Sequence, residues 1–157
     1  MKGDNRSVRG FTLIELLVVF SFIGILTALG IASYAAFNGE QALSSSAADV
    51  ATMLNSAKSH ALTQVKQNNC TTNSISGYEV DILVTTQQYS LSAVCGSTHV
   101  LTTNRLPSSV TFGGSSATSV FYYVSSGTVQ APASIIINGY GKTKTISVSS
   151  TGIVSIQ

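Results

Sequence analysis

The sequence predicts an α+β fold in which one long N-terminal helix packs against an antiparallel β-sheet. Three observations lead to this prediction. No proline occurs before Pro107, so nothing interrupts a helix in the N-terminal part of the 157-residue chain. Apolar residues recur at helical spacing between Leu43 and Val65. From Tyr78 onward, short runs of alternating apolar and polar residues are separated by turn residues.

The first half of the predicted helix is apolar. No charged residue occurs from Leu16 to Gly39, and an uncharged helix of that length can cross a hydrocarbon core of ~30 Å. We therefore expect residues 11–37 to form a transmembrane helix. Residues 1–10 precede it as a short polar leader with three basic residues, Lys2, Arg6 and Arg9.

The basic leader also predicts the orientation of the chain. Positive charge before an apolar span keeps that end in the cytoplasm. Residues 38–157 should then lie on the far side of the membrane as one globular domain, without a separate second domain.

The second half of the predicted helix is amphipathic. Its apolar residues recur every three or four positions along one face; they are Leu43, Ala47, Val50, Leu54, Ala57, Ala61 and Val65. This stripe predicts a single helix from Thr12 to Gln67, which would be roughly 80 Å long at 1.5 Å per residue. The stripe should supply the helix side of the hydrophobic core.

The C-terminal half of the chain reads as antiparallel strands. The alternating runs, spaced by Ser, Thr, Gly and Asn, are residues 78–84, 88–94, 109–112, 119–124, 134–138, 144–149 and 152–157. The last two runs predict a hairpin with Gly152 in its turn.

Charge argues against a large nucleic-acid interface. The net charge of +2 comes from the leader, because five basic and five acidic residues balance each other from Phe11 onward. The candidate cationic cluster is Arg105, Lys142 and Lys144. Lys142 and Lys144 would share one face of a strand. We interpret them as a solvated strand face, with a weak anion or DNA contact as the alternative.

The two cysteines, Cys70 and Cys95, both belong to the predicted exported part. Exported cysteine pairs tend to oxidise, so we predict a disulfide, with two free thiols as the alternative. The bridge would close a loop of about 26 residues and stabilise the fold by roughly 3–4 kcal/mol. Neither cysteine has the spacing of a metal site.

No arrangement in the sequence predicts an enzyme. The two histidines, His60 and His99, accompany no nucleophile motif, and His60 is expected to be exposed. Glu79 and Asp81 form a carboxylate pair, but alternation on a half-exposed strand explains them. The sequence predicts no catalytic residue, metal site or cofactor.

Glu15 is unusual because it lies inside the apolar segment. Thr12 and Glu15 fit the T-x-x-E capping box, in which the two side chains satisfy the first helical turn. A carboxylate there also favours the helix dipole. This explanation accounts for Glu15 but not for the Arg9-Gly10 pair in front of Phe11.

The combination of these features is more specific than any of them. A basic leader, Gly10, the sequence FTLIE from Phe11 to Glu15, and a long apolar run closely resemble the class III signal of type IV pilins and type II secretion pseudopilins. The resemblance implies that a prepilin peptidase cleaves between Gly10 and Phe11 and methylates the new amine. It also implies that Glu15 pairs with the Phe11 amine of a neighbouring subunit in a filament.

Later segments resemble the GspH/FimT group of minor pseudopilins and minor pilins, on residues 47–65 and 135–157. The resemblance implies a minor pseudopilin of a type II secretion pseudopilus, or alternatively a minor pilin of a type IV pilus that serves assembly or DNA uptake. Its partners would be prepilin peptidase, other pilin or pseudopilin subunits, the inner-membrane assembly platform and membrane lipid. A bacterial inner-membrane protein with a periplasmic domain is implied. A single-pass scaffold that is never processed remains a further alternative.

Overall fold

The computed structural model describes residues 10–64, 70 and 74–157, and within helix α1 it describes only the backbone of residues 28–33, 35 and 36. Two compact units make up the chain, Met1–Phe37 and Asn38–Gln157. Helix α1, Leu13–Thr63, contributes its first part to one unit and its second part to the other. The predicted leader lies outside the described residues, except for Gly10.

Helix α1 ends four residues before the predicted end at Gln67. Gln64 has a φ of 49°, a left-handed conformation that terminates a helix. The backbone N–H of Ser125 donates to the Ala61 carbonyl at 3.0 Å, and Gln64 Nε2 donates to Ser125 Oγ at 3.0 Å. A turn from a distant part of the sequence therefore caps the C-terminal end of the helix, which helical periodicity cannot reveal.

The predicted apolar stripe of the helix is confirmed as the centre of the core. Its members from Leu43 to Ala61 are all at most 1% exposed, while Val65 lies outside the described residues. Across from them the strands contribute alternating side chains that are almost fully buried, including Tyr78, Val80, Leu91, Tyr122, Ile135, Ile137 and Ile146. The helix and both sheets described below thus share one core.

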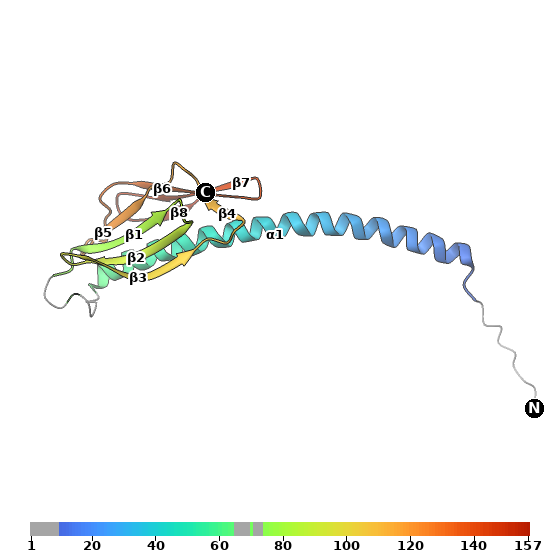
Figure 1. Cartoon of the computed structure of the whole chain (residues 1–157), viewed down its shortest axis with the longest axis horizontal. Helices are drawn as coiled ribbons and strands as arrows, with labels where there is room; N and C mark the ends of the chain where they lie inside the picture. The colour runs from blue at the N-terminus through green and yellow to red at the C-terminus, as the bar shows by residue number, and fades with distance from the viewer. Residues whose placement is uncertain (1–9, 65–69, 71–73) are drawn as a thin grey trace, which may run out of the picture. The chain divides into compact units, whose positions relative to one another are not determined.

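The described strands form two antiparallel sheets of four strands each (Figure 1). The first has the order β3-β2-β1-β5, with β1 at Gly77–Leu83, β2 at Gln88–Val94, β3 at Thr98–Arg105 and β5 at Ser119–Tyr123. The second has the order β4-β6-β7-β8, with β4 at Val110–Phe112, β6 at Ala133–Gly139, β7 at Lys142–Val148 and β8 at Val154–Ile156. The α+β fold class, with a long N-terminal helix and antiparallel strands, is confirmed.

Two details differ from the sequence prediction. We expected one sheet, but the segment after β5 turns back on it, with Tyr123 N–H donating to the Thr128 carbonyl, and so occupies the outer edge of β5. Strand β3 was absent from the predicted runs. It is an edge strand with little buried surface, so its residues do not alternate between apolar and polar.

The β6–β7 hairpin meets the helix near the start of the second unit. Its two-residue turn, Tyr140 and Gly141, has positive φ at both positions, 54° and 72°, as a type I′ turn requires. The Tyr140 ring lies against Gly39, where an added Cβ would approach ring carbons to 2.7 Å. The Tyr140 hydroxyl donates to Ser109 Oγ at 2.9 Å.

The predicted C-terminal hairpin is present, with β7 paired to β8 and Gly152 in the turn at a φ of 70°. Gly152 also lies against another loop, because an added Cβ there would be 2.3 Å from the carbonyl oxygen of Gly127. Conformation and close approach therefore both require glycine at this position.

Candidate functional site

The first turn of α1 has one half of the predicted capping box, the contact from the Glu15 backbone to the Thr12 side chain, while the Glu15 carboxylate meets the Thr12 hydroxyl. The backbone N–H of Glu15 lies 3.4 Å from Thr12 Oγ1, and the Thr12 hydroxyl lies 3.5 Å from Glu15 Oε2. Both contacts are long and exposed, so they hold the turn loosely and leave the carboxylate accessible to another group. Gly10 and Phe11, which flank the predicted cleavage position, are exposed.

Most of the described side chains from Phe11 to Leu26 are large, apolar and exposed. Exposed fractions reach 77% for Phe11, 84% for Leu13 and 68% for Leu26. A helix that exposes this many large apolar side chains needs a lipid or protein environment.

Among the residues whose side chains the structure describes, no helix combines the length and the apolar character needed to cross a membrane.

Cys70 and Cys95 form a disulfide in the structure, with their Cα atoms 5.8 Å apart. Both side chains are buried. Cys95 directly follows β2, so the bridge ties the segment after helix α1 to the end of a central strand. The bridge therefore closes the predicted loop between the two cysteines.

Among the described residues, no contact joins the three predicted cations into a single patch. Lys142 Nζ lies 2.6 Å from Glu40 Oε2, and both side chains are more than half exposed. That pairing, with a smaller effect of Lys144, lowers the pKa of Glu40. Arg105 belongs to the other sheet, where its Nε donates to the Thr86 carbonyl at 3.1 Å. Part of the cationic charge is therefore already neutralised within the chain.

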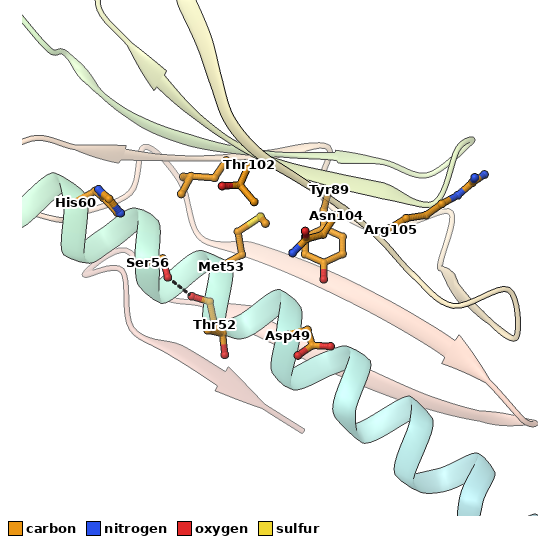
Figure 2. A pocket seen from close by; sticks show the side chains of 10 residues that line it. Asp49, Thr52, Met53, Ser56, His60, Tyr89, Thr102, Asn104 and Arg105 are labelled. Atoms are coloured by element: carbon orange, nitrogen blue, oxygen red, sulfur yellow. Dashed lines mark hydrogen bonds between the residues drawn. The ribbon is translucent and has the colours of Figure 1, made fainter. Parts of the chain in front are cut away.

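A polar groove that the sequence did not predict lies between helix α1 and strand β3 (Figure 2). Its volume is about 610 Å³. The helix lines it with Asp49, Thr52, Met53, Ser56 and His60, and the strands line it with Tyr89, Leu91, Thr102, Asn104 and Arg105. We refer to these ten residues as the α1–β3 groove.

The spacing of the helix residues could have indicated the groove. Asp49, Met53, Ser56 and His60 recur every three or four positions, beside the buried stripe. The polarity of Asp49, Ser56 and His60 is typical of an ordinary solvated face, whereas Met53 is apolar and buried. The neighbouring strand β3, which turns that face into a groove, was not among the predicted strands.

The prediction that His60 is exposed is wrong. Its side chain is only partly accessible, and its ring packs against the ring of Tyr78 with the centroids 5.3 Å apart. Among the described residues, its buried Nδ1 atom has no hydrogen-bond partner. The helix turns His60 further toward the sheet than its polar neighbours suggested.

The carboxylates of Glu79 and Asp81 lie on the face of the first sheet that points away from the helix. Burial raises the pKa of Asp81, and the neighbouring Glu79 charge raises it further, while the hydroxyl of Ser92 opposes this effect. Among the described residues, no group of three or more metal-binding side chains lies together.

Comparison with known proteins identifies both the N-terminal motif and the fold. Residues 5–31 match the family described as the prokaryotic N-terminal methylation motif. A comparison with curated proteins finds no significant sequence match.

Two solved structures with a similar fold are of the minor pseudopilin EpsH from the type II secretion system of Vibrio cholerae. One aligns with a TM-score of 0.55 at 15% identity, over 73% of this chain and 95% of EpsH. The other aligns with a TM-score of 0.56 at 14% identity, over 74% and 93%. The predicted resemblance to type IV pilin-like proteins is thereby confirmed in motif and fold.

Proposed function

We propose that this chain is a minor pseudopilin, a structural subunit of a type II secretion pseudopilus. The observation that carries the proposal is the methylation motif at residues 5–31 preceding a domain with the fold of EpsH. Neither feature alone would be sufficient, because similar folds host different functions. Together they support a chain that is processed at its N-terminus and then assembled through it.

In this proposal, prepilin peptidase cleaves between Gly10 and Phe11 and methylates the amine of Phe11. Residues 11–37 then hold the subunit in the bacterial inner membrane, with the leader cytoplasmic and residues 38–157 periplasmic. The exposed apolar side chains from Phe11 onward support this role, because they need lipid first and neighbouring helices afterward.

Glu15 would specify how subunits stack. An unpaired carboxylate in the low-dielectric core of a filament costs several kcal/mol. Pairing with the Phe11 amine of a neighbour removes that cost at one axial offset, so Glu15 selects a register. Its loose contact with Thr12 leaves an oxygen available for the pairing.

Partners follow from the same role: prepilin peptidase, other pseudopilin subunits and the inner-membrane assembly platform. We propose a structural function rather than an enzymatic one, because the solved relatives in fold are pseudopilins.

The first test is the N-terminal sequence and intact mass of the protein recovered from its own cell membranes. We expect a chain that begins at Phe11, carries one added methyl group and lacks the two thiol hydrogens of Cys70 and Cys95. A chain that begins at Met1, or is cut after another residue, would overturn the proposal.

The second test is the variant Glu15→Gln, with Glu40→Gln, which lies in residues 38–157, as the matched control. We expect both variants to be processed normally, and only Glu15→Gln to lose incorporation into filaments isolated by shearing. Normal incorporation of Glu15→Gln would contradict the register role of Glu15 while leaving the processing result intact.

A further inference from the structure

Two carboxylates lie at the centre of the face of the first sheet that points away from helix α1. Glu79 and Asp81 are two residues apart on β1, so their side chains leave the same face about 6.6 Å apart along the strand. Among the described residues neither carboxylate has an ion-pair partner, because the ion pair present there joins Lys142 to Glu40. This face therefore carries two negative charges that no described cation neutralises by contact.

A buried hydroxyl lies beside the two carboxylates. Ser92 is directly opposite Glu79 in the β1–β2 register and is 0% exposed. It lies close enough to Asp81 to lower the pKa of that carboxyl, yet its Oγ atom makes no hydrogen bond among the described residues. Buried hydroxyl groups are usually satisfied, so this one can accept a hydrogen bond from a donor that a ligand brings.

Apolar side chains border the carboxylates on both sides. Phe121 of β5 is paired with Glu79 on one side. Val100 of β3 is paired with Ser92 on the other side and is 59% exposed. The Phe121 ring meets the ring of Tyr123, which is 43% exposed, edge to face with the centroids 5.1 Å apart. We refer to six residues of this surface as the acidic face: Glu79, Asp81, Ser92, Val100, Phe121 and Tyr123.

A small cavity adjoins the aromatic end of the acidic face. Its volume is about 210 Å³, and Ser119 and Phe121 of β5 form part of its wall. Most of the remaining wall consists of small apolar residues, Ala117, Ala131, Pro132 and Ala133. An aliphatic side chain would fill this space, whereas a charged group would lose its hydration there.

Arginine suits the acidic face better than lysine does. A guanidinium is planar and donates in several directions, so it can contact two carboxylates at once. Its flat surface can also stack on an aromatic ring, which Phe121 supplies next to Glu79. The ammonium group of lysine is a compact point charge without such a surface.

We propose that the acidic face binds a segment of another protein through an arginine side chain, with an aliphatic side chain of the same segment in the adjoining cavity. The arginine contacts Glu79 and Asp81 and stacks on Phe121. Charge complementarity selects the arginine, and the cavity fixes which residue of the segment lies beside it. The inference depends only on residues 38–157 and is independent of the proposed filament role.

A second copy of this chain is a poor occupant, because its described basic side chains in residues 38–157 are already engaged. Two of them donate to backbone carbonyls and two act on the Glu40 carboxylate; they are Lys58, Arg105, Lys142 and Lys144. The one arginine among them has a buried aliphatic neighbour, Leu106, which cannot reach a cavity on another molecule. The segment therefore belongs to a different protein.

The first test uses the isotope-labelled full chain in detergent micelles and two end-blocked hexapeptides, TLSRST and TRSLST. Leu and Arg are two residues apart in both, in opposite orders. We expect one peptide to shift the NMR signals of Glu79, Asp81 and Phe121 in a saturable titration. Replacement of its Leu by Ala should weaken binding by about threefold or more, and replacement of its Arg by Glu should abolish binding.

Charge removal tests the contact with the carboxylates. The double variant Glu79→Gln/Asp81→Asn preserves side-chain volume and should weaken binding of the Arg peptide by about tenfold or more. The matched control, Glu40→Gln/Asp49→Asn, removes two exposed carboxylates elsewhere and should leave binding unchanged. Unshifted signals with both Arg peptides, shifts confined to another face, or equal binding by parent and Glu79→Gln/Asp81→Asn would overturn the proposal.

A single variant tests the aromatic contact. Phe121 lies over Gly77, where an added Cβ would approach the ring to 2.2 Å. Phe121→Leu keeps an apolar side chain there but removes the flat ring. The parent should prefer the Arg peptide to its Lys counterpart by about threefold or more, and Phe121→Leu should lose that preference. An unchanged preference would contradict the stacking contact.

A further measurement tests the natural occupant in intact cells. A photo-crosslinking amino acid replaces Tyr123 on the acidic face, and a matched one replaces Ser155 in β8, an edge strand of the other sheet. We expect a product at position 123 alone, in which a different protein is attached through a segment that contains an arginine, and its loss in Glu79→Gln/Asp81→Asn. A product of twice the mass of this chain, an attached segment without arginine, or no product specific to position 123 would contradict the proposal.

Discussion

At the scale of single residues, the hydroxyl of Tyr122 is the most notable polar group in the core. Tyr122 is 0% exposed, and its hydroxyl has no hydrogen-bond partner among the described residues. Burial raises its pKa well above the ordinary value of 10.0. An unsatisfied buried hydroxyl costs about 1–3 kcal/mol, so its removal should relieve a penalty.

We therefore predict that Tyr122→Phe leaves the free energy of unfolding unchanged or raises it by about 1 kcal/mol. The control is Tyr89→Phe, because the side chain of Asn104 acts on the Tyr89 hydroxyl and opposes the rise that burial causes in the pKa of Tyr89. That variant should lose about 1 kcal/mol. Denaturant unfolding of the purified variants measures both. A clear destabilisation by Tyr122→Phe would show that its hydroxyl is satisfied in solution.

The raised pKa of Asp81 should make the stability of the fold depend on pH. Its pKa is raised above 3.8 in the folded chain, so ionisation is less favourable there than in the unfolded chain. The stability that this difference contributes is complete below pH 3.8 and is lost as the pH rises through the raised pKa. Asp81→Asn should therefore increase the melting temperature at pH 7 and leave it nearly unchanged at pH 3.

Thermal denaturation at the two pH values measures this, with Asp49→Asn as the control on an exposed carboxylate. An equal effect of Asp81→Asn at both pH values would contradict the electrostatic explanation.

At the scale of elements, glycines in two hairpin turns separate the cost of backbone strain from the cost of a steric clash. Gly141 and Gly152 both have φ near +70°. An added Cβ meets nothing at Gly141 but would collide with the Gly127 carbonyl at Gly152. Gly141→Ala should cost about 1 kcal/mol from backbone strain alone. Gly152→Ala should cost about 3 kcal/mol or more, since a packed loop must also move.

Unfolding free energies of the two variants test this comparison. Equal costs would mean that the Gly127 loop yields without penalty.

The disulfide is the second feature that acts at the scale of elements. The cysteines are 25 residues apart in sequence, and constraint of a loop of that size stabilises by about 3–4 kcal/mol in the chain-entropy model. We predict that the double variant Cys70→Ala/Cys95→Ala loses about this much stability. Reductant should lower the melting temperature of the parent and leave that of the double variant unchanged. If reductant lowered the melting temperatures of the parent and the double variant equally, the disulfide would not be the cause of the change.

At the scale of the whole molecule, charge is balanced from Phe11 onward, and Lys142 is paired with Glu40. Affinity for duplex DNA depends on several uncompensated cations acting together. We therefore predict no detectable retention of duplex DNA at about 150 mM salt, where nonspecific binding is already weak. A gel-shift titration checks this. Retention that is lost in Lys142→Gln/Lys144→Gln would show that the basic strand binds anions.

Periodicity predicted those parts of the fold that are half buried. The stripe from Leu43 to Ala61 and the alternation in β1 both follow from one face meeting the core and one meeting water. Strand β3 gave no such signal, because an edge strand over a groove has two accessible faces. The division into two sheets also depended on which strand ends were already occupied, as the segment after β5 shows, and that information is not local.

The candidate sites divide in the same way. Glu15 and the cleavage position are contiguous in sequence, so a motif could reveal them. The α1–β3 groove joins the helix residues that line it, from Asp49 to His60, with residues about fifty positions later, such as Thr102 and Asn104. Only the fold brings these together, and the misassigned exposure of His60 has the same origin.

The contact between Gly39 and Tyr140 has a consequence for how this chain can change over generations. The Tyr140 ring occupies the space that any side chain at position 39 would need. The backbone of Tyr140 has a left-handed conformation, which is unusual for tyrosine. A larger residue at position 39 is therefore acceptable only when a smaller one arrives at position 140. Across relatives that share this turn, the two positions should vary as a pair, a hundred residues apart in the gene and inherited as a single compatible unit.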